Sequence, residues 1–438
     1  MAALTARGRF GISLGLERIG AILDELDHPE RSLRGALVGG TNGKGSVVAM
    51  VRSVLQAAGL RVGTMPKPHL VAYRERIAVD GQPISEAEFA AAIQRVLPAV
   101  DAVAARLGPP TEFETLTAAA FGELTRRRVD LAVVEVGMGG RLDATNVLDP
   151  GVAVITNVQK DHERYLGSTL AAIGGEKAAI IKAGDLAVTG ATGRGLTPIR
   201  DRSARLGVPL RMAGRGRPFR TRLREAGWQG IVVDAATPDG SLDGLRIGLL
   251  GGFQAENAAV ALAVLDALRE DGERRGAPLR QLGAEAIRRG LAAARWPGRL
   301  EFLPDTALGP VLLDGAHNPA GARALARALE ELGVTDFPLV FGATRGKRVS
   351  DMLRALAVRR PRAVFTAIGE ARALPAEHLL ATWRRIGGGD AQAVAEAGTA
   401  LERAAALRHD PRQPLVVAGS LYLVGAVRAR LLGAEAAA

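Results

Sequence analysis

The sequence predicts an α/β protein with two parallel-sheet domains. Short apolar runs alternate with segments of helical periodicity in the first and last parts of the chain, as in βαβ units. From about Gly190 to Gly252 the chain changes to short Gly- and Arg-rich strand-like pieces, and Trp296 to Arg299 has the turn residues of a linker. We therefore expect a larger domain over residues 1–296, with a parallel sheet and a small antiparallel β flap, and a smaller Rossmann-like α/β domain over 297–438.

The composition limits the class of protein. A chain of 438 residues is long for a single core. It has no Cys, which excludes disulfides, thiolate metal sites and Cys nucleophiles and fits a reducing compartment. No apolar run approaches the roughly 18 residues of a membrane span, and residues 1–11 lack the apolar core of a signal peptide. We expect a cytoplasmic protein with no membrane partner.

The formal charge of +11 raises the alternative of nucleic-acid binding. The basic residues are scattered, however, and aromatic residues make up only 4% of the chain, so few side chains are available for base stacking. We expect no nucleic-acid partner. Of the 57 basic residues only six are Lys, at positions 44, 67, 160, 177, 182 and 347. Because an ammonium group suits a phosphate contact or a nucleophilic amine, each Lys is a candidate site residue.

The expected elements follow from periodicity and punctuation. A capping box of Ser85 and Glu88 predicts a helix to about residue 107, and two prolines exclude a helix from 63–70, which we interpret as a loop. Helical spacing predicts further helices at 13–27, 47–58, 114–128, 170–181, 254–268, 284–294, 320–332 and 349–356. Apolar runs predict buried strands at 131–137, 152–155, 186–189, 311–314, 338–341, 363–366 and 414–417.

Residues 36–46 form the motif around which the chain is organised. An apolar run ends in Gly39-Gly40, and Lys44 and Ser46 open a helical pattern. This is a P-loop layout, in which backbone N–H groups and a helix N-terminus hold a polyphosphate such as that of ATP. Val38 and Gly45 depart from the usual pattern, so this is a variant. The expected phosphate ligands are Thr41, Asn42, Gly43, Lys44, Gly45 and Ser46. The alternative is a glycine-rich turn that binds nothing.

Two polar positions follow strands near this loop. Glu135 interrupts an apolar strand, and a carboxylate there is placed to hold Mg²⁺ directly or through water; the alternative is an ion-paired structural Glu. His162 follows the strand at 152–155, and its pattern fits a metal ligand as well as it fits an ordinary core or surface His.

The second domain also places polar residues after its strands. Asp314 and His317 follow the first of them, Lys347 the next and Ser420 the last. Two polar edges that face each other across a linker describe a cleft. Such a cleft permits ATP to phosphorylate a carboxylate and an amine to attack the acyl phosphate, sheltered from water. The residues do not require this chemistry; an ATPase or nucleotide-sensing module is the alternative.

Taken together, these motifs resemble the folylpolyglutamate synthase/dihydrofolate synthase branch of the Mur-type ADP-forming ligases. The resemblance runs in family order over nearly the whole chain. The matching stretches are 14–19, 40–46, 68–70, 75–77, 113–117, 135–146, 156–167, 176–178, 254–259, 297–301, 314–319 and 419–424. Other Mur-type ligases carry a sizeable domain before the phosphate loop, and about 38 residues are too few for one.

The resemblance implies a reaction and a set of roles. The reaction joins L-glutamate to dihydropteroate, or to the γ-carboxyl of a folate glutamate tail, through an acyl phosphate, and a monomer is expected. Lys177 is expected to be carbamylated and, with His162, to hold a second Mg²⁺, while Glu135 serves the first. Asn257, Arg299 and Asp314 are expected to contact ATP. Phe113, Glu114, Arg141 and Asp143 match the pterin or folate site, and His317 and Ser420 match the site of the incoming glutamate. Lys44, Lys177 and His317 are the expected catalytic residues.

Two positions depart from the family pattern. Lys67 replaces a Ser that serves the first Mg²⁺, and a protonated Lys cannot ligate a metal. We therefore predict that Lys67 contributes its charge to the phosphates. Ser13 stands where an Asp often precedes the Leu-Gly-Leu-Glu-Arg stretch, which bears on the dihydropteroate contact.

Overall fold

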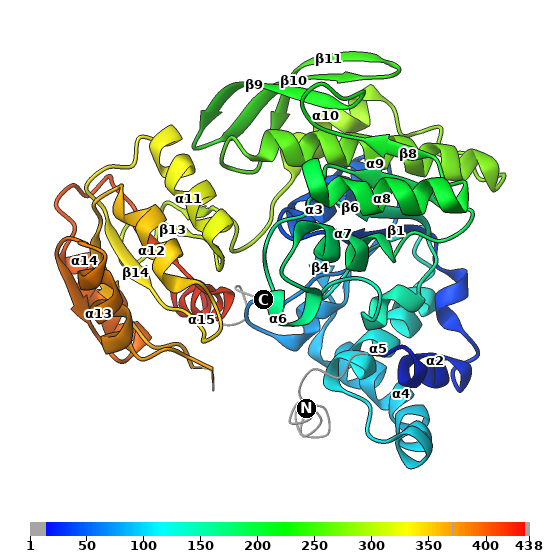
Figure 1. The fold of residues 1–438 in the computed structure, drawn as a ribbon, viewed down its shortest axis with the longest axis horizontal. Coiled ribbons are helices and arrows are strands. Elements are labelled where there is room, and N and C mark those ends of the chain that lie inside the picture. The colour runs from blue at the N-terminus through cyan, green and yellow to red at the C-terminus, as the bar shows by residue number, and fades with distance from the viewer. Residues whose placement is uncertain (1–14, 370–371, 434–438) are drawn as a thin grey trace.

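The computed structural model describes residues 15–369 and 372–433. Ser13 and the start of the helix predicted at 13–27 lie outside these residues. Two lobes are visible in Figure 1, an N-terminal lobe drawn from blue to green and a C-terminal lobe drawn from yellow to red. No helix in the described parts of the chain has the length and apolar character needed to span a membrane.

An eight-stranded sheet forms the centre of the N-terminal lobe, in the order β4-β3-β2-β5-β1-β6-β7-β8. Six strands are parallel: β1 (Gly35–Gly39), β2 (Val62–Met65), β5 (Leu131–Glu135), β6 (Gly151–Ile155), β7 (Leu186–Thr189) and β8 (Leu210–Met212). The short β3 (Ala78–Val79) and β4 (Gln82–Pro83) add an antiparallel edge. The phosphate-loop strand β1 lies between β5 and β6, so the ends of these three strands meet at one edge.

Helices cover both faces of this sheet. Residues alternate along β1, with Val38 facing one core and Leu37 the other, as a buried strand requires. The Val38 side packs against α3 (Lys44–Ala57), α9 (Gln254–Arg274) and α10 (Ala284–Ala293). The Leu37 side packs against α2 (Glu17–Asp24), α4 (Glu86–Leu107), α5 (Glu112–Arg126), α7 (Leu170–Ala178) and α8 (Gly193–Leu206). The described residues of this lobe also include a short helix, α6 (Glu163–Leu166), and the 3-10 turns η2 (Pro29–Ser32), η3 (Tyr73–Arg76) and η4 (Ala144–Val147).

The flap is confirmed in part. Strands β9 (Arg220–Gly227), β10 (Gly230–Thr237) and β11 (Gly240–Ile247) form an antiparallel sheet of their own, at the top of Figure 1. Residues 193–206, predicted within the flap, are instead the helix α8, because Leu196, Ile199 and Ser203 bury one helical face despite the Gly and Pro residues around them. The loop predicted at 63–70 begins only after Met65, since Gly63 to Met65 pair with β5.

The C-terminal lobe contains a six-stranded sheet in the order β12-β13-β17-β14-β15-β16. Its strands are β12 (Glu301–Leu303), β13 (Val311–Leu313), β14 (Pro338–Phe341), β15 (Arg362–Phe365), β16 (Ala391–Ala393) and β17 (Leu415–Ala418), all parallel to their neighbours except β12. One face packs on α11 (Pro319–Glu331), α12 (Val349–Ala357) and α13 (Ala376–Arg385), the other on α14 (Ala397–Ala406) and α15 (Leu421–Leu432). The predicted α/β class is confirmed for both lobes; the boundary near residue 297 stays a prediction.

Candidate active site

The phosphate loop, residues 40–46, leaves β1 and enters α3. Gly43 has a φ of 80°, and a Cβ there would lie 2.3 Å from Oδ1 of Asn257, so both backbone and space require glycine. Lys44 turns back over the loop, and its Nζ donates to the carbonyls of Gly40 (3.2 Å) and Thr41 (3.3 Å). The loop is therefore closed around an ammonium group, as a polyphosphate site requires.

Neighbouring elements hold the remaining loop residues. Asn157, after β6, accepts from the backbone N–H of Thr41 through its carbonyl (3.1 Å) and from that of Asn42 through its side chain (3.0 Å). At the start of α3, the hydroxyl of Ser46 accepts from Nε2 of Gln254 (3.3 Å). Gln254 in turn accepts from Asn257 (2.8 Å), and a Cβ on Gly45 would meet Trp296 at 2.6 Å. Asn257 therefore packs against the loop at Gly43, and Trp296 packs against it at Gly45, both of them positions predicted to bind phosphate.

Glu135 ends β5 opposite Val38 and points at the loop. Its carboxylate lies 3.9 Å from Nζ of Lys44 and accepts from the backbone N–H of Lys67 (3.3 Å). Burial raises the pKa of Glu135 and lowers that of Lys44, while their mutual attraction opposes both shifts. A buried carboxylate beside a phosphate lysine has the donor chemistry that Mg²⁺ prefers.

Lys177, on α7, reaches the same loop from the other side. Only 3% of the residue is exposed, and its Nζ donates to the Gly40 carbonyl at 3.0 Å. Burial lowers the pKa of Lys177 to about 7. No carboxylate among the described residues forms an ion pair with it. A large fraction of this amine is therefore unprotonated and nucleophilic near neutral pH.

Asp161 joins the two lobes, and it was not predicted as a site residue. It follows β6, and its carboxylate lies 2.9 Å from Nζ of Lys347, accepts from Nδ2 of Asn318 (3.2 Å) and lies 3.8 Å from Nε2 of His317. Asn318 also donates to Oδ1 of Asn42 at 3.0 Å. The C-terminal lobe therefore contacts the phosphate loop directly. The feature of the sequence that could have identified Asp161 is its position next to His162, just after the end of β6.

The two predicted histidines lie around this carboxylate. His162 has a φ of 50°, and its side chain is 42% exposed, with Nε2 4.0 Å from Asp161. Burial lowers the pKa of His162, and the charges of Lys347, Lys44 and Lys177 add to this effect. Nδ1 of His317 lies 2.8 Å from the Gly315 carbonyl, which can only accept, so Nδ1 carries the proton and Nε2 is left as an acceptor. Burial lowers the pKa of His317 to about 4, so this ring is neutral at pH 7.

The other predicted site residues of the C-terminal lobe contact their own lobe at the same sheet edge. Arg299 donates to the Gly315 carbonyl (3.0 Å), and its charge lowers the pKa of Lys44 after the larger effect of burial. Asp314 accepts from the backbone N–H of Leu300 (2.9 Å). Ser420 caps α15 by accepting from Tyr422 (3.2 Å) and is buried. Arg299 thus approaches the loop, whereas the contacts of Ser420 are within its own helix turn.

The four predicted pterin or folate residues fall into two groups. Phe113 faces Nζ of Lys67, which lies 3.4 Å from its ring centroid, and Asp143 accepts from the backbone N–H of Met138 (2.8 Å). In contrast, Glu114 is buried against Arg18 (3.1 Å), and Arg141 pairs on the surface with Glu176 (2.9 Å). Nζ of Lys67 lies over Phe113, and its predicted contact with the phosphates stays a prediction.

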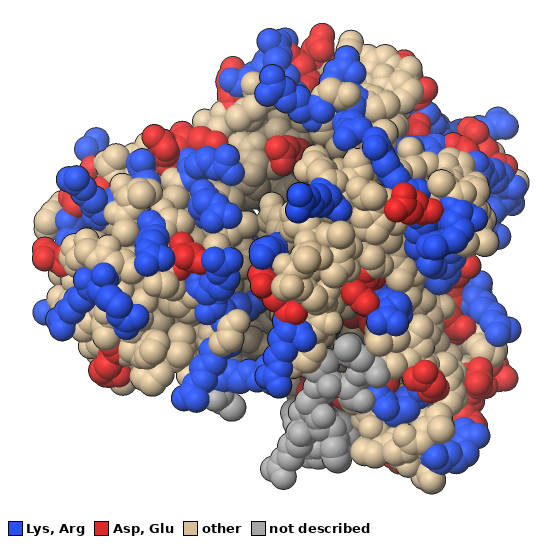
Figure 2. Space-filling view, viewed as in Figure 1, with Lys and Arg blue, Asp and Glu red and all other residues tan. Residues whose placement is uncertain are grey.

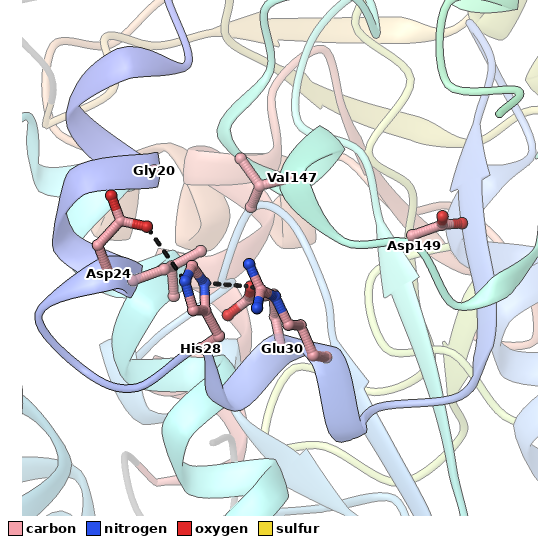
Figure 3. A pocket seen from close by; sticks show the side chains of 8 residues that line it. Gly20, Asp24, His28, Glu30, Val147 and Asp149 are labelled. Atoms are coloured by element: carbon pink, nitrogen blue, oxygen red, sulfur yellow. Dashed lines mark hydrogen bonds and ion pairs between the residues drawn. The ribbon is translucent and has the colours of Figure 1, made fainter.

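Two cavities are present, of which the first lies apart from these residues and the second is lined in part by Lys347. A cavity of about 420 Å³ is lined from α2, η2 and the loop before β6, at the amino ends of the parallel strands and so opposite the phosphate loop. Figure 3 shows His28 there between Asp24 (3.2 Å) and Glu30 (3.1 Å). A second, of about 480 Å³, adjoins Lys347 in the C-terminal lobe. In Figure 2 Lys and Arg are spread over both lobes among Asp and Glu.

Comparisons with known proteins identify the class. The Mur ligase middle domain model matches residues 38–265, and the dihydrofolate synthetase C-terminal domain model matches residues 304–431. The dihydrofolate synthase/folylpolyglutamate synthase of Bacillus subtilis is 38% identical over 80% of each chain. The corresponding protein of Mycobacterium tuberculosis is 36% identical over 95% of this chain and 90% of that one.

Solved structures agree with these matches. The folylpolyglutamate synthase of Mycobacterium tuberculosis complexed with ADP has a TM-score of 0.87 and 36% identity, covering 98% of this chain and 96% of that chain. Escherichia coli FolC in complex with DHPP and ADP has a TM-score of 0.82 and 29% identity, covering 97% and 95%. Fold, phosphate loop and matches together define an ADP-forming ligase of the Mur type. Within that class, the chain belongs to the dihydrofolate synthase/folylpolyglutamate synthase family.

Proposed function

We propose that the protein joins L-glutamate to an acid of the folate series, either dihydropteroate or the γ-carboxyl group of a folate glutamate tail, and converts ATP to ADP and phosphate. The observation that carries this proposal is the docking of the second polar edge on the phosphate loop, through Asn318 on Asn42 and Lys347 on Asp161. An enzyme that only hydrolysed ATP would need the loop but not this second edge.

The first step makes the acid reactive. A carboxylate oxygen of the acid attacks the γ-phosphorus of ATP, the bond to the ADP oxygen breaks, and an acyl phosphate forms. Lys44 and the N-terminus of α3 would stabilise the charge that develops on the transferred phosphoryl group. Arg299, Asn257 and Asp314 are proposed to orient the nucleotide, since the first two approach the loop.

The second step forms the amide. The unprotonated amine of glutamate attacks the acyl carbon, and phosphate leaves. We propose that Nε2 of His317, an acceptor that faces the inter-lobe contact, accepts a hydrogen bond from the amine of glutamate and orients it for attack, while the proton released as the amide forms leaves with the phosphate. Ser420 is proposed at the glutamate carboxylates, and Phe113, Glu114, Arg141 and Asp143 at the pterin or folate. Contact between the lobes would shelter the acyl phosphate from water.

We propose that the site holds two Mg²⁺ ions. Although no three His, Asp or Glu side chains gather as a metal group in the described residues, Glu135 faces the phosphate loop and would serve one ion. Carbamylation would give Lys177 a carboxylate: its free amine attacks CO₂, an N–C bond forms and one proton is released. That carbamate and His162 would hold the second ion. Mg²⁺ supplies charge neutralisation to the phosphates.

The test is an assay of purified protein with ATP, Mg²⁺ and L-glutamate, offering dihydropteroate or tetrahydrofolate separately and resolving products by mass. A product heavier by one glutamyl unit is expected, with ADP formed in equal amount. Phosphate release that ignores glutamate and pteridine would overturn the proposal in favour of an ATPase. We further propose a cytoplasmic monomer with no nucleic-acid or membrane partner, which light scattering and salt-dependent binding assays would check.

A further inference from the structure

Lys67 holds an ammonium group that forms no ion pair with a carboxylate of the described residues, although Asp143 and Glu135 attract it from a greater distance. Its backbone N–H binds Glu135 on the phosphate side (3.3 Å), while its side chain turns away and places Nζ 3.4 Å from the centroid of the Phe113 ring. No carboxylate within the described parts of the chain lies at ion-pair distance from this Nζ. The residue therefore spans from the phosphoryl-transfer side of the site to the proposed acid-substrate side.

The local packing leaves room for this position. Gly137 follows β5, and a Cβ there would lie 2.1 Å from Nζ of Lys67 and 2.8 Å from Oδ2 of Asp143. Asp143 is the nearest source of negative charge, but its oxygens already accept from the backbone N–H groups of Met138 (2.8 Å) and Thr145 (3.1 Å). Asp143 is therefore occupied in holding its own loop.

Arg76 is a second cation at this place, and it is only 7% exposed. Its Nε donates to Nδ1 of His69 at 3.0 Å, whereas its buried Nη1 has no hydrogen-bond partner. A buried N–H left without a partner is unfavourable and therefore calls for an explanation. Burial lowers the pKa of Lys67, and the like charge of Arg76 adds to this effect, so the two cations lie near each other. Glu112 attracts Arg76, and an anion bound at Lys67 would reduce the repulsion between the two cations.

We propose that Lys67, with Arg76 beside it, binds the carboxylate of the acid substrate and holds it next to the phosphate loop before phosphoryl transfer. This inference rests on the proposed function and names the group that receives its reacting carboxylate. A carboxylate is the anion that fits, because the ammonium lies over an aromatic ring suited to the aryl group that carries the acid, while the backbone of the same residue binds Glu135, beside which the γ-phosphate would lie. Lys67 is thereby a substrate-binding residue and makes no contact with the metal.

The test measures equilibrium binding without ATP or Mg²⁺, by calorimetry, for dihydropteroate and for its carboxamide. The wild type is expected to bind the carboxylate at least about tenfold more tightly, since a charge-assisted contact is lost with the amide. Lys67→Met keeps the length of the side chain and its packing on Phe113 but removes its charge, so its preference for the carboxylate should fall to the part that Arg76 supplies, clearly below that of the wild type. Lys67→Arg should retain most of the preference.

Three outcomes would overturn the inference. In the first, Lys67→Met keeps the full preference for the carboxylate. In the second, this variant weakens ATP and leaves the acid unchanged, which would place the charge on the phosphates. In the third, the wild type binds neither ligand; the proposed function falls as well only if tetrahydrofolate also fails to bind. Thermal unfolding of each variant separates lost binding from lost folding, and Lys160→Met, an exposed Lys, should change neither affinity by more than about twofold.

Discussion

Asp161 of the N-terminal lobe and Lys347 of the C-terminal lobe form an ion pair, with 2.9 Å between Oδ1 and Nζ, although 186 residues separate them in the chain. Both side chains are at least four-fifths buried, so the pair is shielded from salt. The attraction of Lys347 lowers the pKa of Asp161 against the opposing effect of burial. The pair therefore stays ionised across the physiological pH range and helps to keep the second polar edge over the loop.

Removing either partner should lower glutamate-dependent turnover. We expect Asp161→Asn and Lys347→Met each to reduce kcat/KM for glutamate by about tenfold or more, because each leaves a mostly buried charge without its partner. The fold-loss of kcat/KM in the double variant should be smaller than the product of the two single fold-losses, which corresponds to a coupling energy of about 0.5–3 kcal/mol. Steady-state kinetics over this cycle measure the coupling. Arg222→Met, which breaks an exposed pair on the flap, is the control and should have no effect; strictly additive losses would contradict the prediction.

Lys44 should matter for nucleotide use and not for folding. Replacement by Met removes the ammonium that donates to Gly40 and Thr41 and would contact the phosphates. We expect kcat/KM for ATP to fall by about 10²–10³-fold, the usual loss for one preorganised donor. Since burial of this ammonium is unfavourable, as its lowered pKa indicates, urea unfolding should show no loss of stability. Near-normal activity in Lys44→Met would show that the loop does not bind the transferred phosphoryl group.

Gly43 should tolerate no side chain. Its φ of 80° is strained for any L residue, and a Cβ would overlap Oδ1 of Asn257. We expect Gly43→Ala to destabilise the protein by about 1–3 kcal/mol and to weaken ATP binding, because relief of the overlap must move Asn257 or the loop. Gly122→Ala is the matched control: this helical glycine has open space around its Cβ position and should gain about 0.4–1 kcal/mol. Denaturant unfolding and nucleotide titration check both variants.

Features that depend on neighbouring residues in the chain, such as helix caps and buried strands, could be predicted from the sequence. The Ser85/Glu88 capping box marked the start of α4, and its two reciprocal hydrogen bonds are present. Apolar runs located the buried strands because a strand covered on both faces has no polar positions to spare. The helix α8 was missed, since its Gly, Arg and Pro residues hide a short apolar face that only the packing against α7 reveals.

The site was predictable in its parts but not in its assembly. Lys44, Glu135 and Lys177 could be named because each is an unusual residue at a strand end or in a Lys-poor chain, and the structure brings all three to one loop. The contact of Lys67 with Phe113 and the pairing of Asp161 with Lys347 depend on how distant segments meet. No local pattern encodes those distances.

Burial of Lys177 should give a pH-dependent cost in stability. Its pKa is about 7 in the folded protein against 10.5 for an ordinary Lys, so between these values the unfolded chain binds more protons and stability rises with pH. Below pH 7 the full cost remains. In CO₂-depleted buffer, Lys177→Met should therefore be more stable than the wild type at pH 6, and the difference should shrink as pH approaches 10. Urea unfolding across this range tests the trend, and a difference that does not change with pH would contradict it.

Carbamylation of Lys177 should make the activity depend on CO₂. Only the unprotonated amine attacks CO₂, so a pKa of about 7 leaves roughly half of it reactive at neutral pH, whereas an ordinary Lys would be almost wholly protonated. Thorough removal of CO₂ should reduce turnover, bicarbonate should restore it, and protein loaded with ¹³C-bicarbonate should show a carbamate carbon by NMR. The signal should be absent from Lys177→Met and unchanged in Lys182→Met, because the half-buried ammonium of Lys182 binds the Leu148 carbonyl and not the phosphate loop. Full activity without CO₂, with no carbamate signal, would mean that Lys177 acts as an uncharged amine on the Gly40 carbonyl.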